Sequence, residues 1–498
     1  MSAAHSSTRP DTGAETGTGR APGHVVVIGG GISGLAAAHR LTGGGARVTV
    51  LEATGRLGGK LLAGEIAGVP VDLGAEAMLA RRPEAVDLAR AVGLGDRLQP
   101  PATATAALWT RGALRPMPKG HLMGVPGDLD LLASSGVISP PGLERIAEDR
   151  ALPRTEVGED VAVGEYVAAR LGREVVDRLV EPLLGGVYAG DAYRISMRAA
   201  VPQLFEAARA GRSLIEGIRG IQARTAARAA GPGQAPAPVF MGIDGGVGTL
   251  PAAVAEAVRA AGGDIRTHTP VRELRRTADG WRVVLDGDGG GPAVLDADAV
   301  VLAAPAPAAA ALLATEAPAA ATELSAVEYA SMALVTLAFR RADIATALSG
   351  SGFLVPPVDG HTIKASTFAS NKWGWIAAAD PDVFVLRTSV GRYAEEADLR
   401  REDAELVELS LRDLGEAVGL AARPVAQRVT RWDGGLPQYP VGHLERVARI
   451  RAEAGKLPGL RVCGALYDGV GIPACIASGR TAADDILDTL PQAAASGE

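Results

Sequence analysis

Cysteine and lysine are scarce in this chain of 498 residues. The two cysteines, Cys463 and Cys475, exclude a disulfide-bonded scaffold and fit a reducing cytoplasm. Five of the 50 basic residues are lysines, and we attribute this imbalance to genomic base composition, not to nucleic-acid binding. Because the net charge is −7, no nucleic acid is expected as a partner.

Long apolar runs and metal-ligand patterns are also missing. The longest uncharged apolar run, Ala299–Thr315, is mostly alanine and contains two prolines, so no transmembrane segment is expected. The seven histidines include no pair at metal-ligand spacing, so no metal site is expected. Residues 1–23 lack an apolar segment and are interpreted as a disordered leader, and 491–498 as a tail. These absences predict a cytoplasmic protein.

A glycine motif follows the leader. Val25–Ile28 is an apolar run of strand length, and Gly29, Gly31 and Gly34 then form the pattern G-x-G-x-x-G. Apolar residues at helical spacing and a second strand ending at Glu52 complete a strand–turn–helix–strand unit. This context predicts a dinucleotide site, with the pyrophosphate at the helix N-terminus and Glu52 accepting hydrogen bonds from a ribose. A carboxylate there also argues against a ribose 2′-phosphate.

A second glycine pair, Gly58 and Gly59, comes soon after the acid, between Arg56 and Lys60. NAD-binding motifs do not require it. Two adjacent glycines permit another close backbone approach, and the two cations add positive charge beside a diphosphate. The arrangement resembles the FAD-binding start of the flavin-containing amine oxidase superfamily, although a plain loop with solvated cations is the alternative interpretation.

Two later segments fit the same nucleotide-binding body. Residues 240–258 read as a strand end, a glycine-rich turn and a helix, and 262–274 as a strand that contains Val271. In the superfamily the backbone of that strand meets the adenine. Residues 460–487 read as strand, glycine-rich turn and helix, and the turn at 468–473 is expected beside the flavin ring. The resemblance implies these FAD-binding residues: Gly29, Gly30, Gly31, Ile32, Ser33, Gly34, Glu52, Ala53, Arg56, Gly59, Lys60, Gly74, Ala75, Glu76, Ala77, Val271, Ala465, Val470, Gly471 and Ile472.

The pieces predict an α/β (α+β) fold with a discontinuous, Rossmann-like FAD-binding domain, a mixed-sheet substrate domain and a helical insertion. Apolar residues at helical spacing between Val163 and Leu183 indicate the helical part, and Ala229–Pro238 reads as a linker. The expected boundaries are 24–80, 236–305 and 455–490 for the FAD-binding domain, 81–119 and 306–454 for the substrate domain, and 120–235 for the helical domain.

Several stretches within these insertions resemble the porphyrinogen-oxidising flavoenzymes, in particular the coproporphyrinogen III oxidases of Gram-positive bacteria. The similarity spans about residues 24–490 and is carried by residues 114–126 (LRPMPKGHLMGVP), 181–196 (EPLLGGVYAGDAYRIS), 371–373 (NKW), 431–443 (RWDGGLPQYPVGH) and 467–479 (YDGVGIPACIASG). The first and fourth stretches are the most specific, because no generic nucleotide-binding fold needs them.

This resemblance implies oxidation of coproporphyrinogen III to coproporphyrin III in haem biosynthesis. Three hydrides pass in turn from bridge carbons to FAD, and oxygen reoxidises the flavin to yield hydrogen peroxide. The cofactor carries the hard chemistry, so the lack of a nucleophile–base constellation is expected. Transient contacts with other haem-pathway enzymes are also conceivable.

Three alternatives stay open: protoporphyrinogen IX as substrate, an amine oxidase or carotenoid desaturase of the same fold, and a non-catalytic flavin and porphyrin carrier. Four carboxylates on the substrate and a chain without a membrane span favour coproporphyrinogen III. The sequence offers no clear aromatic pair beside the flavin turn, which argues weakly against an amine oxidase.

The substrate requires a wide apolar cavity with cations for its propionates. The family-like stretches supply these candidates: Arg81, Arg82, Lys119, Lys364, Lys372 and Arg431, with Tyr439 as a cavity wall. For each cation alone, a solvated surface charge is the alternative.

Two positions carry separate expectations. The family has a glycine near Gly186 whose backbone faces the macrocycle, whereas a helix C-cap is the competing interpretation of Gly185 and Gly186. Animal and plant protoporphyrinogen oxidases carry an arginine where this chain has Ala106. Propionate binding in that mode is therefore in doubt, which favours the bacterial type of pocket.

Overall fold

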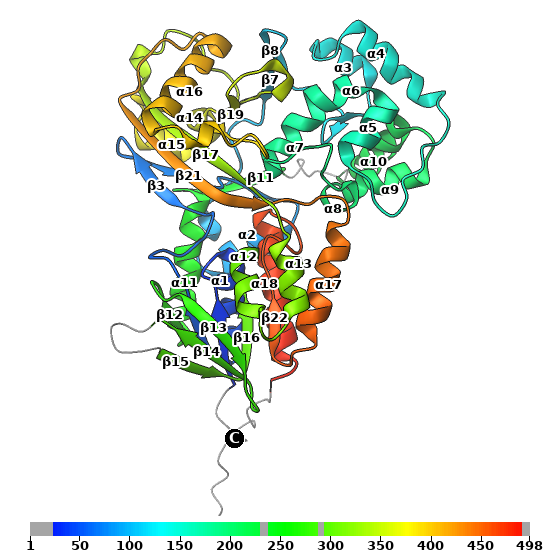
Figure 1. Ribbon diagram of the computed structural model, residues 1–498. Helices are drawn as coiled ribbons and strands as arrows, with labels where there is room; N and C mark the ends of the chain where they lie inside the picture. The colour runs from blue at the N-terminus through cyan, green and yellow to red at the C-terminus, as the bar shows by residue number, and fades with distance from the viewer. Residues whose placement is uncertain (1–22, 230–237, 287–292, 491–498) are drawn as a thin grey trace, which may run out of the picture.

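The computed structural model describes residues 23–229, 238–286 and 293–490 (Figure 1). The predicted leader, the predicted tail and most of the predicted linker 229–238 lie outside the described residues. Figure 1 shows a parallel sheet at one end of the molecule, and a seven-stranded sheet and a helical region side by side at the other. The predicted mixed α/β class is confirmed. Within the described ranges, no helix has the length and apolarity that crossing a bilayer needs.

The parallel sheet forms because its strands are short apolar runs that can be buried on both faces. Its strands, in spatial order, are β12 (Asp264–Arg266), β2 (Arg47–Leu51), β1 (His24–Ile28), β16 (Ala299–Leu302) and β22 (Leu460–Val462), all parallel. Val25 and Val27 of β1 enter one core, and Val26 and Ile28 enter the core on the opposite face.

Helices and a small meander cover the two faces of the parallel sheet. The first face is packed by α1 (Ile32–Gly43), α2 (Pro83–Ala91), α11 (Leu250–Ala260) and α18 (Ile472–Leu487). The second face is packed by β13 (Val271–Arg276), β14 (Trp281–Leu285) and β15 (Ala293–Ala297), together with α12 (Ala306–Leu313), α13 (Pro318–Ser325) and α17 (His443–Gly455). A small antiparallel sheet of β5 (Met78–Leu79), β11 (Phe240–Ile243) and β6 (Leu98–Gln99) adjoins this body.

The seven-stranded sheet is mixed, as expected for the substrate part. Its order is β21 (Ala426–Pro437), β17 (Tyr329–Arg340), β20 (Val383–Val390), β19 (Ile363–Thr367), β18 (Gly352–Leu354), β7 (Ala106–Thr110) and β8 (Ala113–Pro116). Neighbouring strands are antiparallel, except that β18 and β7 run parallel. Helix α16 (Asp403–Val418) covers one face. The other face meets α14 (Ala369–Lys372), α15 (Gly374–Ala379) and the hairpin of β3 (Ala63–Ile66) and β4 (Val69–Asp72).

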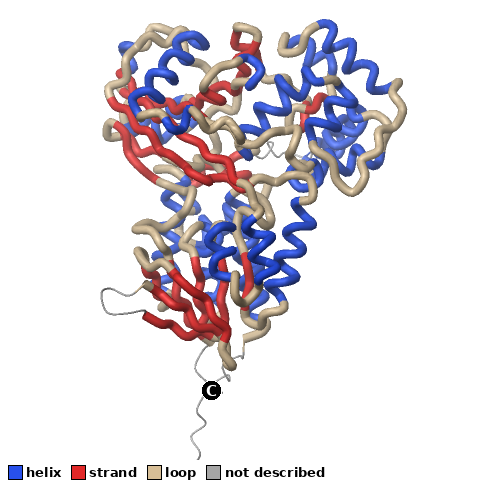
Figure 2. Tube along the Cα trace, viewed as in Figure 1, coloured by secondary structure: helices blue, strands red, loops and turns tan. Residues whose placement is uncertain are grey.

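The helical region lies beside this sheet, and Figure 2 shows that helix dominates it. Its helices are α3 (Leu129–Ser135), α4 (Pro140–Ala147), α5 (Val163–Leu171), α6 (Arg173–Val175), α7 (Glu181–Tyr188), α8 (Met197–Ala200), α9 (Pro202–Ala210) and α10 (Leu214–Ala229). The hairpin of β9 (His121–Leu122) and β10 (Val125–Pro126) packs against α10.

The helical spacing between Val163 and Leu183 is interrupted. Gly172 has φ +89° and ends α5, because this backbone conformation cannot continue a right-handed helix. The chain then resumes as α6, a π-helical turn at Val176–Val180, and α7. A Cβ at Gly124 would lie 2.7 Å from the Val180 nitrogen, so the family-like β9–β10 hairpin sits tightly against the π turn.

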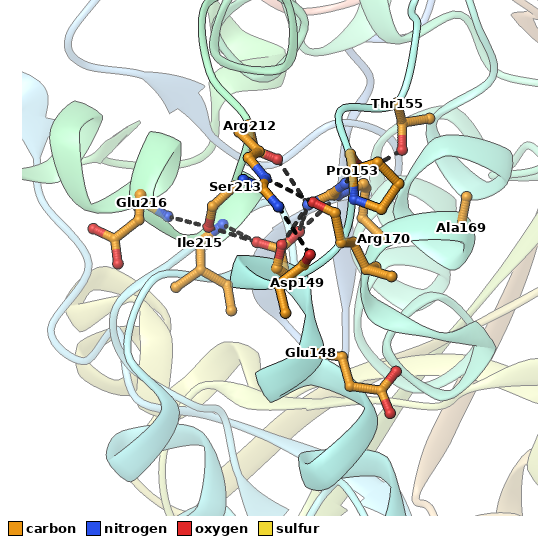
Figure 3. Close-up of polar contacts among 12 residues, drawn as sticks. Glu148, Asp149, Pro153, Thr155, Ala169, Arg170, Arg212, Ser213, Ile215 and Glu216 are labelled. Carbon is orange, nitrogen blue, oxygen red and sulfur yellow. Dashed lines mark hydrogen bonds and ion pairs between the residues drawn. The ribbon is translucent and has the colours of Figure 1, made fainter.

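A buried ion pair ties the helical region together (Figure 3). The Arg170 and Asp149 side chains are both 0% exposed, and the Arg170 Nε donates to Asp149 Oδ1 at 2.7 Å. The same guanidinium donates to the carbonyls of Asp149, Pro153 and Arg212. The second Asp149 oxygen accepts from the Ser213 hydroxyl at 2.6 Å and the Ile215 N–H at 3.1 Å. Both buried charges are thus fully hydrogen-bonded, as buried ions require.

The predicted domain boundaries do not coincide with the packing at two places. Within 81–119, α2 packs in the core of the parallel sheet whereas β7 and β8 join the seven-stranded sheet. Within 306–454, α12, α13 and α17 pack on the parallel sheet. The division into three domains therefore stays a prediction.

Candidate flavin and substrate site

The first glycine loop connects β1 to α1 and leaves the helix N-terminus open. Gly29 has φ +112°, and a Cβ at Gly34 would lie 2.0 Å from the Gly29 oxygen, so both positions require glycine. No side chain caps α1 at Gly31, and no acidic residue lies in its first turn. The free N–H groups and the helix dipole make this end suitable for a phosphate group.

Glu52 holds this loop in place. The Gly30 N–H donates to its Oε2 at 2.8 Å, and Thr54 donates from its N–H and its hydroxyl to Oε1 at 2.8 Å and 2.7 Å. A carboxylate has about four acceptor sites, so a ribose hydroxyl still has a place. Sequence reasoning predicted the ribose role of Glu52 and did not foresee its contact with Gly30.

The second glycine loop is joined directly to the first. The Gly58 N–H donates to the Gly30 carbonyl at 2.8 Å, and Gly31 and Gly58 form a parallel bridge. Gly58 and Gly59 have φ of +100° and +59°, and so the pair exists because both backbones adopt conformations that disfavour side chains. The Arg56 guanidinium lies 5.4 Å from the centre of the Trp432 ring, beside this loop.

Lys60 and Gly74 continue the same wall. A Cβ at Gly74 would lie 2.1 Å from the Lys60 carbonyl, which also accepts from the Ala75 N–H at 3.1 Å. The Lys60 side chain is exposed, and yet desolvation by the surrounding protein lowers its pKa. Ala53 is exposed beside Glu52 on the neighbouring loop.

The segment expected to meet an adenine differs from the prediction. Residues 262–274 do not form one strand: β12 ends at Arg266, and Val271 is the first residue of β13. The turn between them wraps the Glu52 loop, because the Thr269 N–H donates to the Glu52 carbonyl at 2.8 Å. His268 in this turn has φ +51°, which breaks the strand.

The flavin turn lies at the start of α18. Gly471 is the N-cap of this helix, without a side-chain cap, and Ile472 is buried in the core below. The Tyr439 hydroxyl donates to the Ala465 carbonyl. A Cβ at Gly479 would lie 2.1 Å from the Ser33 carbonyl, so α1 and α18 cross at very close range. The first turn of α1 therefore packs against the middle of α18.

These features fit a dinucleotide cofactor. A Cβ at Gly31 would meet no protein atom within 4 Å, so there is room beside this tightly packed loop. The open helix ends of α1 and α18 suit a diphosphate and an electron-rich ring edge, and Lys60 supplies positive charge nearby.

Glu76 and Lys372 were assigned to different ligands by sequence, but they contact each other. The Lys372 ammonium pairs with Glu76 Oε1, and the Arg387 Nη2 lies 3.0 Å from Glu76 Oε2. Arg387 also donates to the Gly74 carbonyl at 2.8 Å. Although burial alone would raise it, the two cations hold the pKa of Glu76 below its usual value. This network braces the Gly74–Ala77 segment against the seven-stranded sheet and leaves Lys372 no free charge.

The other predicted cations divide into paired and unpaired groups. Arg82 pairs with Glu84 at 2.7 Å, and Arg431 pairs with Asp403. Arg81 and Lys119 are exposed on the surface. Lys364 differs from all of them, because it is 7% exposed and burial lowers its pKa to about 7.

The expectation that no aromatic pair lies near the flavin turn is wrong. Tyr188 and Tyr439 have ring centres 5.5 Å apart, and Val470 of the flavin turn packs against the core that contains both. Tyr439 also stacks on His443 at 3.9 Å. Both tyrosines are nearly fully buried, so Tyr439 is a packed residue more than an open cavity wall. The aromatic residues therefore do not distinguish this site from that of an amine oxidase.

Gly185 and Gly186 lie inside α7 and do not cap it. The C-cap is Ala189, which has a left-handed backbone with φ +49°. A Cβ at Gly186 would meet only the Leu354 side chain, at 3.9 Å, and Gly186 itself is exposed. Glycine inside a helix costs about 0.5–1 kcal/mol relative to alanine. In the part of the chain that the structure describes, no contact requires a glycine at this position.

Sequence reasoning missed several buried groups. Arg387 and Arg392 gave no signal, because arginine is common throughout the chain. Asp72 accepts from the Val247 and Gly248 N–H groups at 3.0 Å and 2.8 Å, and burial raises its pKa to about 7. A lone aspartate following an apolar strand and a distant glycine-rich turn gave no pattern that joins them.

Comparison with known proteins identifies the relatives of this chain. Residues 32–487 match the family described as flavin containing amine oxidoreductase. The chain is 38% identical over 475 residues to the coproporphyrinogen III oxidase of Mycobacterium tuberculosis strain H37Rv, covering 94% of this chain and 98% of that protein. It is 33% identical over 477 residues to the Bacillus subtilis strain 168 protein of the same name, with coverage of 94% and 98%.

A solved structure agrees with these relatives. The crystal structure of a protein from Exiguobacterium sp. 255-15, named as a proposed protoporphyrinogen oxidase, superposes with a TM-score of 0.81 at 33% identity. The similarity covers 93% of this chain and 98% of that one.

Proposed function

Because this chain belongs to the family of flavin containing amine oxidoreductases, we propose that it is an FAD-dependent oxidase that converts coproporphyrinogen III to coproporphyrin III. The observation that carries the proposal is similarity over nearly the full length to relatives named coproporphyrinogen III oxidase. The architecture agrees, because the insertions as well as the nucleotide-binding body are shared.

In the proposed cofactor site, each of the glycine loops would contact a different part of FAD. The open end of α1 and the loop Gly29–Gly34 would hold the diphosphate, and Glu52 would bind the adenosine ribose while it fixes Gly30. Gly59, Lys60, Gly74 and Ala75 would line the path to the flavin, and Val470–Ile472 would face its ring. When bound, FAD would accept two electrons and one proton from a substrate bridge carbon in each of the three oxidation steps.

The exposed Gly186 of α7 would provide part of the surface for the substrate. A flat macrocycle needs a wall without projecting side chains, and Gly186 gives α7 such a wall opposite Leu354 of β18. The protein would then act by orienting the macrocycle and by excluding water, which is how a positioned site accelerates a reaction that its cofactor performs.

The test is a comparison of kcat/KM for coproporphyrinogen III and protoporphyrinogen IX, with FAD-loaded enzyme under air and with peroxide release recorded. We expect three peroxides for each coproporphyrin formed and a preference for coproporphyrinogen III. Porphyrin binding without peroxide release would indicate a carrier. If the enzyme oxidises amines and does not oxidise porphyrinogens, it is an amine oxidase and the proposal is wrong.

Protoporphyrinogen IX is the second candidate substrate, favoured by the name of the Exiguobacterium structure. A strong preference for protoporphyrinogen IX in the same experiment would overturn the first choice. Oxygen as the physiological acceptor, a cytoplasmic location and contacts with haem-pathway enzymes stay predictions.

A further inference from the structure

Lys364 is a buried cation without an anion. Its side chain is 7% exposed, and desolvation is the main influence on its ammonium. Among the described residues, the one charge that acts on it appreciably belongs to Arg392 and has the same sign. Burying an ammonium group without a compensating partner is costly, so buried lysines are normally paired. No carboxylate among residues 23–229, 238–286 and 293–490 pairs with this one.

A bulge in β19 presents Lys364 to the helical side of the sheet. Ile363 pairs with Val390 and enters the core beneath α16, whereas the next aligned pair is Ala365 with Ser389. Lys364 is the extra residue between them. The two residues of a bulge oppose one partner residue and point to about the same side, and Ala365 shares the side of Leu354, with which it is aligned, so Lys364 points to that side too. Bulges of this kind commonly re-aim a side chain beside an active site.

The face that Lys364 enters is the face that meets α7. Helix α7 packs on both β18 and β19. Leu354 of β18 is aligned with Ala365, and its side chain is the nearest group to a Cβ built at Gly186. Lys364 therefore lies in the layer between the seven-stranded sheet and the glycine wall of α7.

The carboxylates near Lys364 interact with Arg392. Its guanidinium donates to the Val355 and Ile363 carbonyls at 3.3 Å and 3.4 Å. The carboxylates of Glu395, Glu181 and Asp413 act on Arg392, in that order of strength. Asp413 is further occupied by the N–H groups of Thr362 and Ile363. Arg392 thus takes the local anions and leaves Lys364 with none.

We propose that Lys364 binds a carboxylate of the ligand that lies between α7 and the seven-stranded sheet. This inference rests on the proposed function, under which the carboxylate is a propionate of the tetrapyrrole. It makes Lys364 a specificity residue, since it favours macrocycles that carry a propionate at this position. A small free carboxylate has the same chemistry and is the alternative source.

Binding of a carboxylate at this position should be coupled to protonation of Lys364. An anion beside Lys364 favours the ammonium form, so affinity for the carboxylate falls as pH rises above about 7. The charged groups packed around this region are Arg392, Glu181, Glu395 and Asp413. Burial raises the pKa of Glu181 to about 7 as well, so only the difference between wild type and a Lys364 variant isolates the lysine.

The experiment compares coproporphyrin III with its tetramethyl ester, which has the same ring and no free carboxylate. Binding to FAD-loaded wild type, Lys364→Met and Lys456→Met is titrated by porphyrin fluorescence at pH 6 to 9. Lys456 is the matched control, because it is exposed at the end of α17 and pairs with Glu453. We expect Lys364→Met to bind the acid about 10- to 100-fold more weakly, the range for a lost charge-assisted hydrogen bond, and to bind the ester unchanged.

The outcomes separate the two proposals. An unchanged acid-to-ester ratio in Lys364→Met, with tight acid binding in wild type, overturns the role of Lys364 and leaves the proposed function standing. Wild type that binds neither porphyrin overturns both. If sodium propionate alone stabilises wild type and not Lys364→Met, while the porphyrin ratio is unchanged, the site takes small carboxylates and the macrocycle assignment is wrong. Lys364→Arg keeps the charge and is expected to recover part of the preference for the acid.

Discussion

Arg170 and Lys364 are both buried cations, but their surroundings are opposite. Arg170 is 0% exposed and bonded to Asp149 and to three carbonyl groups (Figure 3). Lys364 is 7% exposed, and the one charge acting appreciably on it among the described residues is another cation. The first arrangement completes its own hydrogen bonding, whereas the second is incomplete until an anion arrives.

The contrast separates structural charge from functional charge. Removing half of a completed pair strands the other half, and so Arg170 should contribute strongly to stability. Removing an unpaired cation relieves a cost, so Lys364 should contribute to binding at the expense of stability. Trade-offs of this kind are expected where a site is built for a ligand and not for the fold.

Loss of Arg170 is the largest expected effect. Arg170→Leu leaves the Asp149 carboxylate buried and short of its main partner, and we expect the helical region to lose about 3–5 kcal/mol of stability. Urea unfolding followed by helical circular dichroism measures this, with Lys456→Met as the control. A change below about 1 kcal/mol would show that Asp149 finds other partners.

Replacement of Lys364 should do the reverse and should depend on pH. The native pKa of about 7 lies below the unfolded value, so between pH 7 and about 10.5 the unfolded chain holds one more proton than the native protein at this residue. Wild-type stability should therefore rise with pH across this window relative to Lys364→Met, by up to about 1.4 kcal/mol per pH unit. Parallel stability curves for the two proteins across this range would contradict the buried, unpaired state.

Lys372 is an intermediate case, because its anion is shared. Lys372→Met leaves Glu76 paired with Arg387 at 3.0 Å, so we expect a loss of only about 1 kcal/mol of stability. The pKa of Glu76 should rise, since one of the two cations that depress it is gone. Wild type should therefore lose more stability than the variant as the pH falls below about 4.5, the ordinary pKa of a glutamate, so that the difference between the two proteins shrinks in acid. If the difference between the two unfolding free energies is the same at every pH, Lys372 does not act on Glu76.

Substitution of Gly186 should give the smallest change in stability, and it should affect stability and substrate binding in opposite directions. Gly186→Ala removes a flexible residue from α7 and should stabilise the protein by about 0.5–1 kcal/mol. A methyl group on the proposed substrate wall should nevertheless raise KM for the porphyrinogen. Gly185→Ala, one position away on the same helix, is the comparison. Equal KM values in wild type and Gly186→Ala would mean that no ligand approaches this position.

Local patterns predicted the glycine loops well, because their conformations need only neighbouring residues. Gly29 and Gly31 lie between β1 and α1, and Gly34 lies in the first turn of α1, as the spacing predicts. Gly58 and Gly59 have backbone conformations that favour glycine. The direct bond between the two loops was not foreseen, although both were assigned to one cofactor.

Contacts between residues far apart in the chain could not be predicted from the sequence. Glu76 and Lys372 are separated by 296 residues, so nothing local indicated that they neutralise each other. The position of Lys364 depends on the register between β19 and β20, and a bulge leaves no mark in composition. The break at Gly172 was readable in principle, since a glycine interrupts the apolar spacing, but the spacing alone suggested one helix.

The π-helical turn at Val176–Val180 fixes the orientation of everything that follows it on the same helix. A π turn contains about one residue more than an α turn, and each helical residue rotates the side-chain direction by about 100°. With that residue deleted, Gly185 and Gly186 would rotate around the helix axis, and bulkier neighbours would face Leu354 in their place. The number of residues in the π-helical turn thus determines whether glycine backbone or larger side chains of α7 face Leu354.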